Sequence, residues 1–384
     1  MSIPSWVWGQ SVMWALAHIY LWARLVRGTT PSRSRARRVG TVLAVVLAAF
    51  IPASLITPFF VDIAVSRWIA WPSNIWYGLA VYLLILLILT EPVRLAAAFI
   101  GKRRAKARAE TPDSARRAFL ARSIAVTAGA AATGIVGYGM ATALSPPRLD
   151  RVTVRLRRGG PLAAGLRIAL VGDIHLGPML GRAHTQRIVD MINGTGADLV
   201  AIVGDLVDGT VEQLASAAAP LRGLRSRHGT FFVTGNHEYL SGATEWIEEL
   251  RELGIRPLQN ERVELPALDL AGVNDVTGAR QDDGPDYERA LGDRDPACPV
   301  ILLAHQPIQV NEAMRHGVDL QLSGHTHGGQ MMPLNLLTSW AQPTLAGYER
   351  FGDTQLYVTK GAGFWGPPVR VGAPPDITIV ELAI

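Results

Sequence analysis

Long uncharged stretches dominate the first 150 residues. They cover residues 1–23, 39–61, 68–90 and 123–147, and the last of them is rich in glycine and alanine. A helix needs about 20 predominantly apolar residues to cross a bilayer, and buried helices of globular proteins rarely remain uncharged over that length. The pattern predicts an all-α transmembrane region of about four helices. Residues 1–122 would hold three spans, and residues 123–147 a fourth span or an export signal.

After residue 150 the pattern changes to short apolar runs that alternate with helical periodicity. Strands are expected at residues 152–154, 166–171, 199–203, 231–234, 268–273, 300–303, 320–322, 356–359 and 377–382. Helices are expected at residues 182–193, 211–224, 244–253 and 308–315. Alternating strands and helices are typical of a layered α/β domain, which would here cover residues 150–384.

The formal net charge of +5 conceals two opposite balances. Residues 1–150 hold 17 Lys and Arg against 5 Asp and Glu, whereas residues 151–384 hold 20 against 27. An acidic domain repels phosphate backbones, so a nucleic-acid polymer is not an expected partner. The basic residues crowd the first and third connections between the apolar stretches, which places those connections in the cytoplasm. We therefore expect a multi-pass protein of the cell membrane with its α/β domain on the extracytoplasmic side.

The fourth apolar stretch allows two interpretations. Arg116 and Arg117 precede it, and it ends in Ala141-Thr-Ala143. This arrangement resembles a twin-arginine export signal followed by an Ala-x-Ala cleavage site. A basic cytoplasmic flank before an ordinary anchor helix explains the same residues. Both interpretations stay open, and with them cleavage after Ala143.

Side chains with metal-ligand chemistry follow five of the predicted strands. They are Asp173 and His175; Asp205 and Asp208; Asn236, His237 and Glu238; His305; and His325 and His327. Ligands of α/β sheets bind beyond the carboxyl ends of strands, and burying so many charges is costly unless a cation compensates them. A glycine precedes four of these clusters, where we expect it to let the backbone turn sharply. With Cys298 as the single cysteine, the carboxylate, imidazole and amide groups favour Mn²⁺, Fe or Zn²⁺ over Ca²⁺.

The order of these clusters from residue 173 to residue 327 resembles the calcineurin-like metallophosphoesterases. The stretches 324–330 and 366–368 resemble the bacterial branch of membrane-associated or exported members. The resemblance implies a four-layer α/β/β/α sandwich that holds two divalent metal ions. It implies that one ion is bound by Asp173, His175 and His327, that the other is bound by Asn236, His305 and His325, and that Asp205 bridges them.

The same resemblance implies roles for three further residues. His237 would lie beside the phosphate as a proton donor or charge stabiliser, while Asp208 and Glu238 would orient their neighbours. The expected activity is hydrolysis of phosphate esters or pyrophosphate by two metal ions. Because the domain is tethered or exported, the expected substrate is a phosphorylated lipid or another cell-envelope molecule. The expected partners are this substrate and the bilayer, and no obligate protein partner is evident.

Three other function classes are compatible with parts of this sequence. A phosphodiesterase or nuclease acting on soluble nucleotides would use the same metals, and a metal-binding membrane scaffold would bind them without turnover. A transporter is disfavoured, because the spans carry almost no polar groups beyond His18 and Asn74. Residues 331–337, Trp340 and the pair Phe364-Trp365 are apolar and close to the site in sequence. They are expected to pack under the sheet, with a lipid-accepting rim as the alternative.

Overall fold

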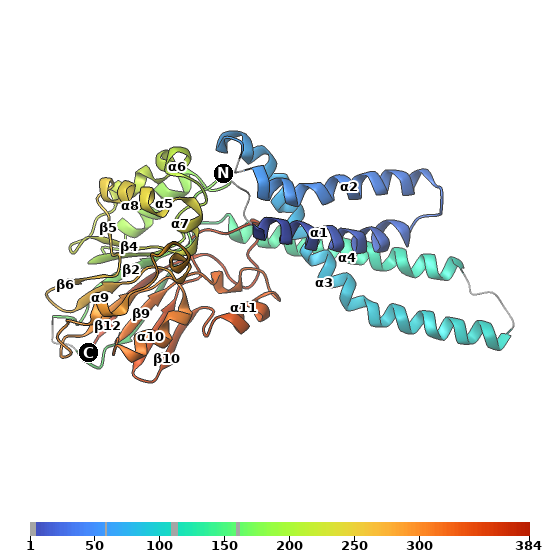
Figure 1. Cartoon of the computed structure of the whole chain (residues 1–384). Helices are drawn as coiled ribbons and strands as arrows, with labels where there is room; N and C mark the ends of the chain where they lie inside the picture. The colour runs from blue at the N-terminus through green and yellow to red at the C-terminus, as the bar shows by residue number, and fades with distance from the viewer. Residues whose placement is uncertain (1–4, 58–59, 109–113, 159–161) are drawn as a thin grey trace. The chain divides into compact units, whose positions relative to one another are not determined.

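A computed structural model describes residues 5–57, 60–108, 114–158 and 162–384. The chain forms two compact units, one made mainly of residues 1–140 and the other of residues 141–384 apart from 366–368. In the described part of the first unit, all the regular secondary structure is helical (Figure 1). Its helices are α1 (Ser5–Trp22), a π-helical turn (Ala23–Arg27), α2 (Arg35–Ile56), α3 (Ile63–Arg108) and α4 (Ser114–Ala143). Residues 1–4 of the first predicted span and 58–59 of the second lie outside the described residues.

Three described helices are long and apolar enough to cross a membrane, where the sequence predicted about four spans. They cover Arg35–Ile56, Ile63–Arg103 and Ala115–Ala143. Helix α1 occupies the first predicted span but is not among these three helices. Its 18 residues include several polar side chains and four tryptophans, which lower its mean hydropathy. Helix α3 also continues beyond the predicted end at residue 90, so the basic connection is helical as far as Arg108.

Several polar side chains inside the helical unit are paired with one another. The indole N–H of Trp76 donates to Nε2 of His18 at 2.9 Å, and the hydroxyl of Tyr20 donates to Glu91 at 2.8 Å. Arg24 also contacts Glu91 at 2.6 Å. Paired groups of this kind are stable in an apolar surrounding and leave these side chains engaged in helix packing.

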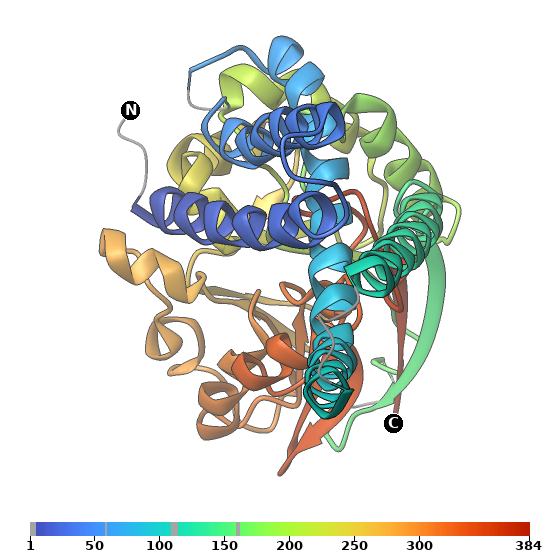
Figure 2. The same cartoon turned by 90° about the vertical axis from the view of Figure 1, so that its right-hand side faces the viewer.

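The second unit contains two six-stranded sheets. The first has the order β1 (Arg148–Arg155), β12 (Asp376–Ala383), β2 (Arg167–Val171), β3 (Leu199–Val203), β4 (Thr230–Val233) and β5 (Arg256–Pro257). The second has the order β10 (Gly347–Phe351), β11 (Thr354–Val358), β9 (Leu320–Ser323), β8 (Val300–Leu303), β7 (Asp269–Gly272) and β6 (Glu261–Glu264). Strands β2 to β5 are parallel to one another, as are β7, β8, β9 and β11. Figure 2 shows β1 in green beside β12 in red at one edge of the first sheet.

The core lies between the two sheets. Alternate residues of each sheet, such as Leu199, Ala201 and Val203 in β3, join one buried cluster with Ile301 and Leu303 of β8. The other residues of the central strands face helices, so these strands are buried on both faces and appear as continuous apolar runs. The layers are therefore α/β/β/α, and the predicted fold class is confirmed.

Helices cover the outer faces of both sheets (Figure 1). The helices of this unit are α5 (Arg182–Asn193), α6 (Val211–Ala218), α7 (Asn236–Ser241), α8 (Ala243–Glu252), α9 (Tyr287–Leu291), α10 (Val310–Arg315) and α11 (Asn335–Ala341), and α11 differs from the others in having no buried residue. The predicted helix 211–224 is divided at Ala219, because Pro220 starts a 3-10 turn there. Strands β5, β6 and β10 were not predicted, since they are short or carry charged residues at the sheet edges.

Candidate metal centre

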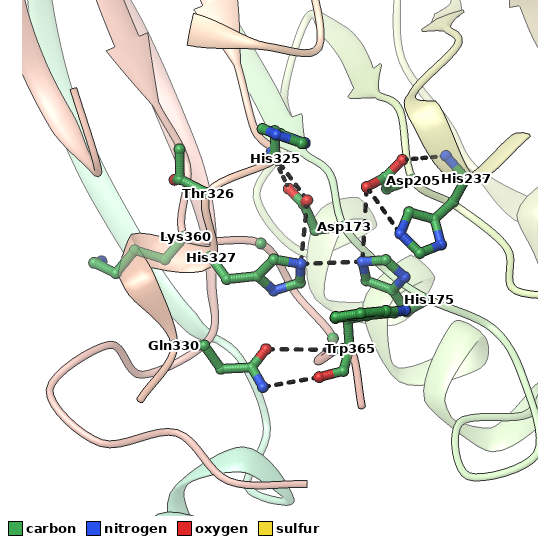
Figure 3. A network of polar contacts seen from close by, with 12 residues as sticks. Asp173, His175, Asp205, His237, His325, Thr326, His327, Gln330, Lys360 and Trp365 are labelled. Carbon is green, nitrogen blue, oxygen red and sulfur yellow. Dashed lines mark hydrogen bonds and ion pairs between the residues drawn. The ribbon is translucent and has the colours of Figure 1, made fainter. Parts of the chain in front are cut away.

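The predicted site residues converge where the central strands of both sheets end. Asp173 and His175 follow β2, Asp205 follows β3, and Asn236 and His237 begin α7 directly after β4. His305 follows β8, and His325 and His327 follow β9. Because β2 to β4 are parallel, as are β8 and β9, the ends of strands far apart in sequence meet in one place. Figure 3 shows the side chains of both sheets pointing toward one another.

Five of these residues have a left-handed backbone conformation. The φ angle is 51° at Asp173, 50° at His175, 51° at Asp205, 72° at His325 and 52° at His327. This conformation costs about 1–2 kcal/mol for a residue with a side chain, and such strain concentrates at functional sites. The sharp turns after the strands are thus made by the polar residues themselves.

Among the four preceding glycines, Gly204 has the positive φ angle expected at a sharp turn, 80°, but two others serve a different purpose. Gly235 and Gly324 do not have positive φ angles. A Cβ atom on Gly235 would lie 2.3 Å from Oδ1 of Asp205, and one on Gly324 would lie 2.3 Å from Oδ2 of Asp173. The expectation of a glycine turn is therefore wrong at these two positions, where glycine leaves room for a carboxylate.

One group of candidate ligands contains Asp173, His175 and His327, all buried, with their ligand atoms within 4.8 Å of one another. The Nε2 atoms of His175 and His327 are 3.0 Å apart, and Nε2 of His327 lies 3.4 Å from Oδ1 of Asp173. The backbone N–H of His325 donates to both oxygens of Asp173, at 2.9 and 3.0 Å. This hydrogen bonding fixes the carboxylate toward the two imidazoles (Figure 3).

A second group contains Asp205, His305 and His325. Nε2 of His305 lies 3.2 Å from Nδ1 of His325 and 3.2 Å from Oδ1 of Asn236. The other nitrogen of His305 donates to the carbonyl of Val203 at 2.7 Å, which leaves Nε2 without a proton in the neutral ring. Oδ2 of Asp205 lies 3.1 Å from this Nε2 and 3.9 Å from Nε2 of His175 in the first group. Asp205 therefore lies between the two groups.

Asp208 connects His175 and His237, and these three residues form a third group whose side chains could hold a metal ion. The Oδ1 atom of Asp208 lies 2.6 Å from Nδ1 of His237 and 3.2 Å from Nδ1 of His175. A carboxylate at Nδ1 fixes the ring orientation and directs Nε2 toward the remaining ligands. In both rings Nε2 is the nitrogen nearest to Asp205.

Glu238 acts on the backbone. Its fully buried carboxylate accepts the N–H groups of Asp205 at 3.0 Å, Leu206 at 2.8 Å and Gly235 at 2.6 Å. These bonds join the turn after β3 to the turn after β4. Glu238 thereby holds Asp205 and Asn236 in register without contacting the ligand atoms itself.

Electrostatics favour ligand protonation states in three of these groups and the opposite state in two. Burial opposes the charge of His305, but Asp205 raises its pKa well above the usual value, and burial raises the pKa of Asp173 to about 6. Burial, followed by the charge of His305, lowers the pKa of His325 to about 3. Burial, followed by Arg370, holds the pKa of His327 well below its usual range. Burial opposes ionisation of Asp205, but His305 and His237 hold its pKa well below the usual value. Neutral imidazoles and an ionised carboxylate are the forms that bind cations.

The donor set fits two divalent ions. Two pairs of imidazole nitrogens lie within 3.2 Å of each other, an arrangement that needs a shared proton or a shared cation. Nitrogen and oxygen donors without thiolates are the ligands of Mn²⁺, Fe and Zn²⁺. All seven predicted ligands lie in the two groups or, as with Asn236, against them. Their assignment as metal ligands remains a prediction.

Sequence reasoning missed Arg370. This fully buried guanidinium donates to the carbonyls of Lys360, Ala373 and His327, at 2.7, 3.2 and 3.1 Å. It also donates to Nδ1 of His327 at 3.0 Å, so Nε2 is the nitrogen that faces Asp173. The available signal in the sequence was a single arginine within an otherwise uncharged stretch after Gly366-Pro-Pro368, which is typical of a buried and functionally placed charge.

Trp365 and Gln330 form one wall beside His237. The rings of Trp365 and His237 meet edge to face with centroids 5.7 Å apart, and Trp365 is 41% exposed. The side chain of Gln330 donates to the carbonyl of Trp365 at 2.9 Å and accepts from its N–H at 3.2 Å (Figure 3). The pair Phe364-Trp365 was expected to pack in the core, which is confirmed for Phe364, at 2% exposed, and wrong for Trp365.

Comparison with known proteins agrees with this geometry. Residues 166–329 match the family model described as calcineurin-like phosphoesterase. The chain is 34% identical over 385 residues to a transmembrane protein with metallophosphoesterase domain from Danio rerio, covering 96% of this chain and 86% of that protein. An uncharacterized metallophosphoesterase from Helicobacter pylori is 42% identical over 254 residues, covering 65% of this chain and 68% of that protein.

Among solved structures, a dimetal phosphatase from Danio rerio matches with a TM-score of 0.39 and 11% identity, covering 56% of this chain and 91% of that one. The sequence comparison with the transmembrane relative extends through the helical unit as well as the sandwich. The residues matched by the family model include both candidate ligand groups. The chain belongs to the calcineurin-like metallophosphoesterase family, whose members are dimetal-dependent phosphoester hydrolases.

Proposed function

We propose that the two groups of ligands hold two divalent cations and that the chain hydrolyses phosphate esters or pyrophosphates at this centre. Asp173, His175 and His327 would hold one cation, Asn236, His305 and His325 would hold the other, and Asp205 would bridge them. The observation that carries the proposal is the position of Asp205, whose Oδ2 lies 3.1 Å from the second group and 3.9 Å from the first.

The bound cations would supply an activated water and would neutralise charge on the phosphoryl oxygens. The chain's own residues would position and protonate the leaving group. Asp208 holds Nδ1 of His237, which leaves Nε2 of that ring to protonate the leaving oxygen. Burial alone would lower the pKa of His237, but Asp205 and Asp208 raise it to about 9. Trp365 shields one side of the ring from water.

Mn²⁺, Fe and Zn²⁺ are the candidate cations, because the donors are imidazole, carboxylate and amide oxygen. The substrate we propose is a lipid-linked or other cell-envelope phosphate ester on the extracytoplasmic side. Its support is the basic first and third connections, together with helices that are long and apolar enough to span a membrane. In this arrangement residues 1–122 and 123–147 anchor the chain, and residues 150–384 form the hydrolase domain.

The test uses the full chain purified in detergent and loaded with Mn²⁺. Lipid phosphates, lipid pyrophosphates, nucleotides and an aryl phosphodiester are compared side by side, with Asp205→Asn as the metal-centre control. Turnover of the lipid substrates that disappears in the control supports the proposal. A preference for nucleotides would instead support the soluble phosphodiesterase, and stoichiometric metal without turnover would support a binding scaffold.

Orientation is tested separately. Cys298 is the single cysteine, so Cys298→Ser with Leu162→Cys yields a chain with one exposed thiol in the α/β domain. A membrane-impermeant maleimide labels this thiol in intact cells if the domain is extracytoplasmic. Labelling only after lysis would place the domain in the cytoplasm.

A further inference from the structure

A long segment next to the metal centre carries no charge. Residues 328–348 contain no Asp, Glu, Lys, Arg or His, although charged residues make up 18% of the chain. The segment directly follows the candidate ligand His327 and includes helix α11. Outside the membrane spans, an uncharged segment of this length is usually core.

This segment is not core along α11. None of its seven residues is buried, and Leu336, Leu337 and Trp340 are 62%, 57% and 85% exposed. Residues three and four positions apart lie on one side of a helix, so these side chains form a single exposed face. Met332, 51% exposed, precedes the helix. We call Met332, Leu336, Leu337 and Trp340 the α11 surface, and the expectation that they pack beneath the sheet is wrong.

The residues before and after α11 are fixed by burial and hydrogen bonds. Met331, before the helix, is buried, and the N–H of Met332 donates to the carbonyl of Val371 at 3.1 Å. Gln342, after the helix, is also buried, and its side chain accepts from the N–H of Ile308 at 2.9 Å. Both ends of α11 are therefore anchored while its apolar side chains face outward, which is typical of a docking surface.

The candidate span α4 indicates what covers this surface. Its last residue, Ala143, already belongs to the α/β unit, where it is buried against Leu180 and Phe364. Phe364 is followed by Trp365. The backbone N–H and carbonyl of Trp365 both form hydrogen bonds with the side chain of Gln330, near the start of the uncharged segment. Four residues separate Ala143 from β1, and four residues span at most about 14 Å. The chain therefore enters the α/β unit directly after a candidate span, and the contacts of Ala143 with Phe364 and of Trp365 with Gln330 connect this entry point to the segment that carries α11.

We propose that the α11 surface docks on the bilayer that holds the chain's own spans. Leu336 and Leu337 enter the outer part of the acyl region, and Trp340 lies at the level of the headgroups, where tryptophan is enriched. The metal centre then receives phosphate groups presented at the membrane surface. This presentation step depends on the proposed hydrolase function, whereas docking itself does not.

The first experiment measures docking without activity. In the Cys298→Ser background, Trp340→Cys and, as control, Leu162→Cys are labelled with an environment-sensitive fluorophore. Leu162 is an equally apolar exposed side chain, 73% exposed, close to the start of β2 and therefore at the opposite end of that strand from the site. The full chain is reconstituted in phosphatidylcholine–phosphatidylglycerol vesicles that contain spin-labelled lipids.

We expect the label at position 340 to be quenched by lipids spin-labelled near the headgroup, and the label at position 162 to remain unquenched. Equal quenching at both positions, or no quenching at position 340, would overturn the proposal. Quenching that depends on protein density and not on spin-labelled lipid would also overturn it, because the surface would then contact a second copy.

The second experiment separates docking from catalysis. The triple variant Leu336→Ser, Leu337→Ser and Trp340→Ser changes only exposed side chains outside the metal centre. It should hydrolyse a long-chain lipid phosphate in vesicles about tenfold more slowly than the parent, with kcat/KM for a water-soluble aryl phosphodiester unchanged. Unchanged hydrolysis of the lipid would contradict presentation. A parent without turnover on any substrate would refute the hydrolase, while quenching at position 340 would still support docking.

Discussion

Oδ1 of Asp208 lies 2.6 Å from Nδ1 of His237. Because this contact occupies Nδ1, the ring presents Nε2 to the metal centre. Burial opposes the negative charge of Asp208, but the imidazoles of His175 and His237 hold the pKa of this carboxyl well below its usual range. Asp208 therefore stays ionised and keeps the proton of His237 in place, which makes His237 suited to proton donation.

His237→Gln tests this role. General acid catalysis contributes about 100-fold or more, so kcat should fall by that factor for alkyl phosphate esters, whose leaving oxygen needs a proton. The loss should be smaller for aryl esters, since their leaving groups are stable as anions. Steady-state kinetics with both ester types, together with elemental analysis, checks the prediction. An equal loss for both types, or a loss of bound metal, would assign His237 a different role.

Glu238→Gln should destabilise the fold. The substitution replaces one carboxylate oxygen with an NH₂ group that faces backbone donors, and a buried unsatisfied group costs about 1–3 kcal/mol. Thermal unfolding in detergent should show a lower Tm, while Glu248→Gln, an exposed substitution on α8, should leave Tm unchanged. A parental Tm in Glu238→Gln would show that the three backbone bonds contribute little to stability.

Trp365→Ala should weaken substrate binding more than chemistry. The bonds between Gln330 and residue 365 use backbone atoms, so they survive the substitution and the loop keeps its position. Loss of the ring beside His237 should raise KM for substrates with apolar groups and change kcat less. Trp365→Phe, which retains an aromatic ring, should behave like the parent. A fall in kcat alone would indicate that Trp365 positions His237.

His184 should make the fold sensitive to acid. Burial, followed by the charge of Arg187, lowers the pKa of His184 to about 4, and its Nε2 is buried without a hydrogen-bond partner. The unfolded chain therefore binds this proton more readily, and folded-state stability falls as the pH drops below the ordinary histidine pKa of about 6.5. Between about pH 7 and pH 5, Tm should fall less in His184→Leu than in the parent. An equal fall in both proteins would remove His184 as a cause.

Asp205→Asn should abolish turnover and preserve the fold. Asn has nearly the same shape, but it lacks the charge that two cations would share at this position. Activity on an aryl phosphodiester should fall by orders of magnitude, with unchanged circular dichroism and a parental Tm. Near-normal turnover in the folded variant would exclude a mechanism in which Asp205 bridges two metals.

Most of the sandwich could be predicted from sequence because its central strands are buried on both faces. Runs such as residues 199–203 contain only apolar side chains, and the polar residues after them mark the strand ends. Convergence of those ends follows from parallel pairing, which is why Asp173, Asp205 and His305 could be grouped before the structure was known. Edge strands lack this signal, as in β6, whose sequence is Glu-Arg-Val-Glu.

Other features depend on tertiary contacts that sequence patterns do not contain. The glycines at 235 and 324 leave space for carboxylates from other strands, so only the folded chain reveals their purpose. Apolar residues alone also could not show that Leu336 and Trp340 face outward while Met331 is buried. Arg370 is a charged residue whose partners are carbonyl groups in three stretches of the chain, at residues 327, 360–363 and 373, and nothing in its local sequence predicts them.

Elemental analysis of the full chain, purified and loaded with Mn²⁺ and then freed of unbound metal, tests the central claim most directly. Two imidazole–carboxylate groups that share Asp205 should retain about two transition-metal ions per chain. Asp205→Asn, measured in parallel, should retain fewer. A parent chain that is folded and retains no stoichiometric metal would contradict the account.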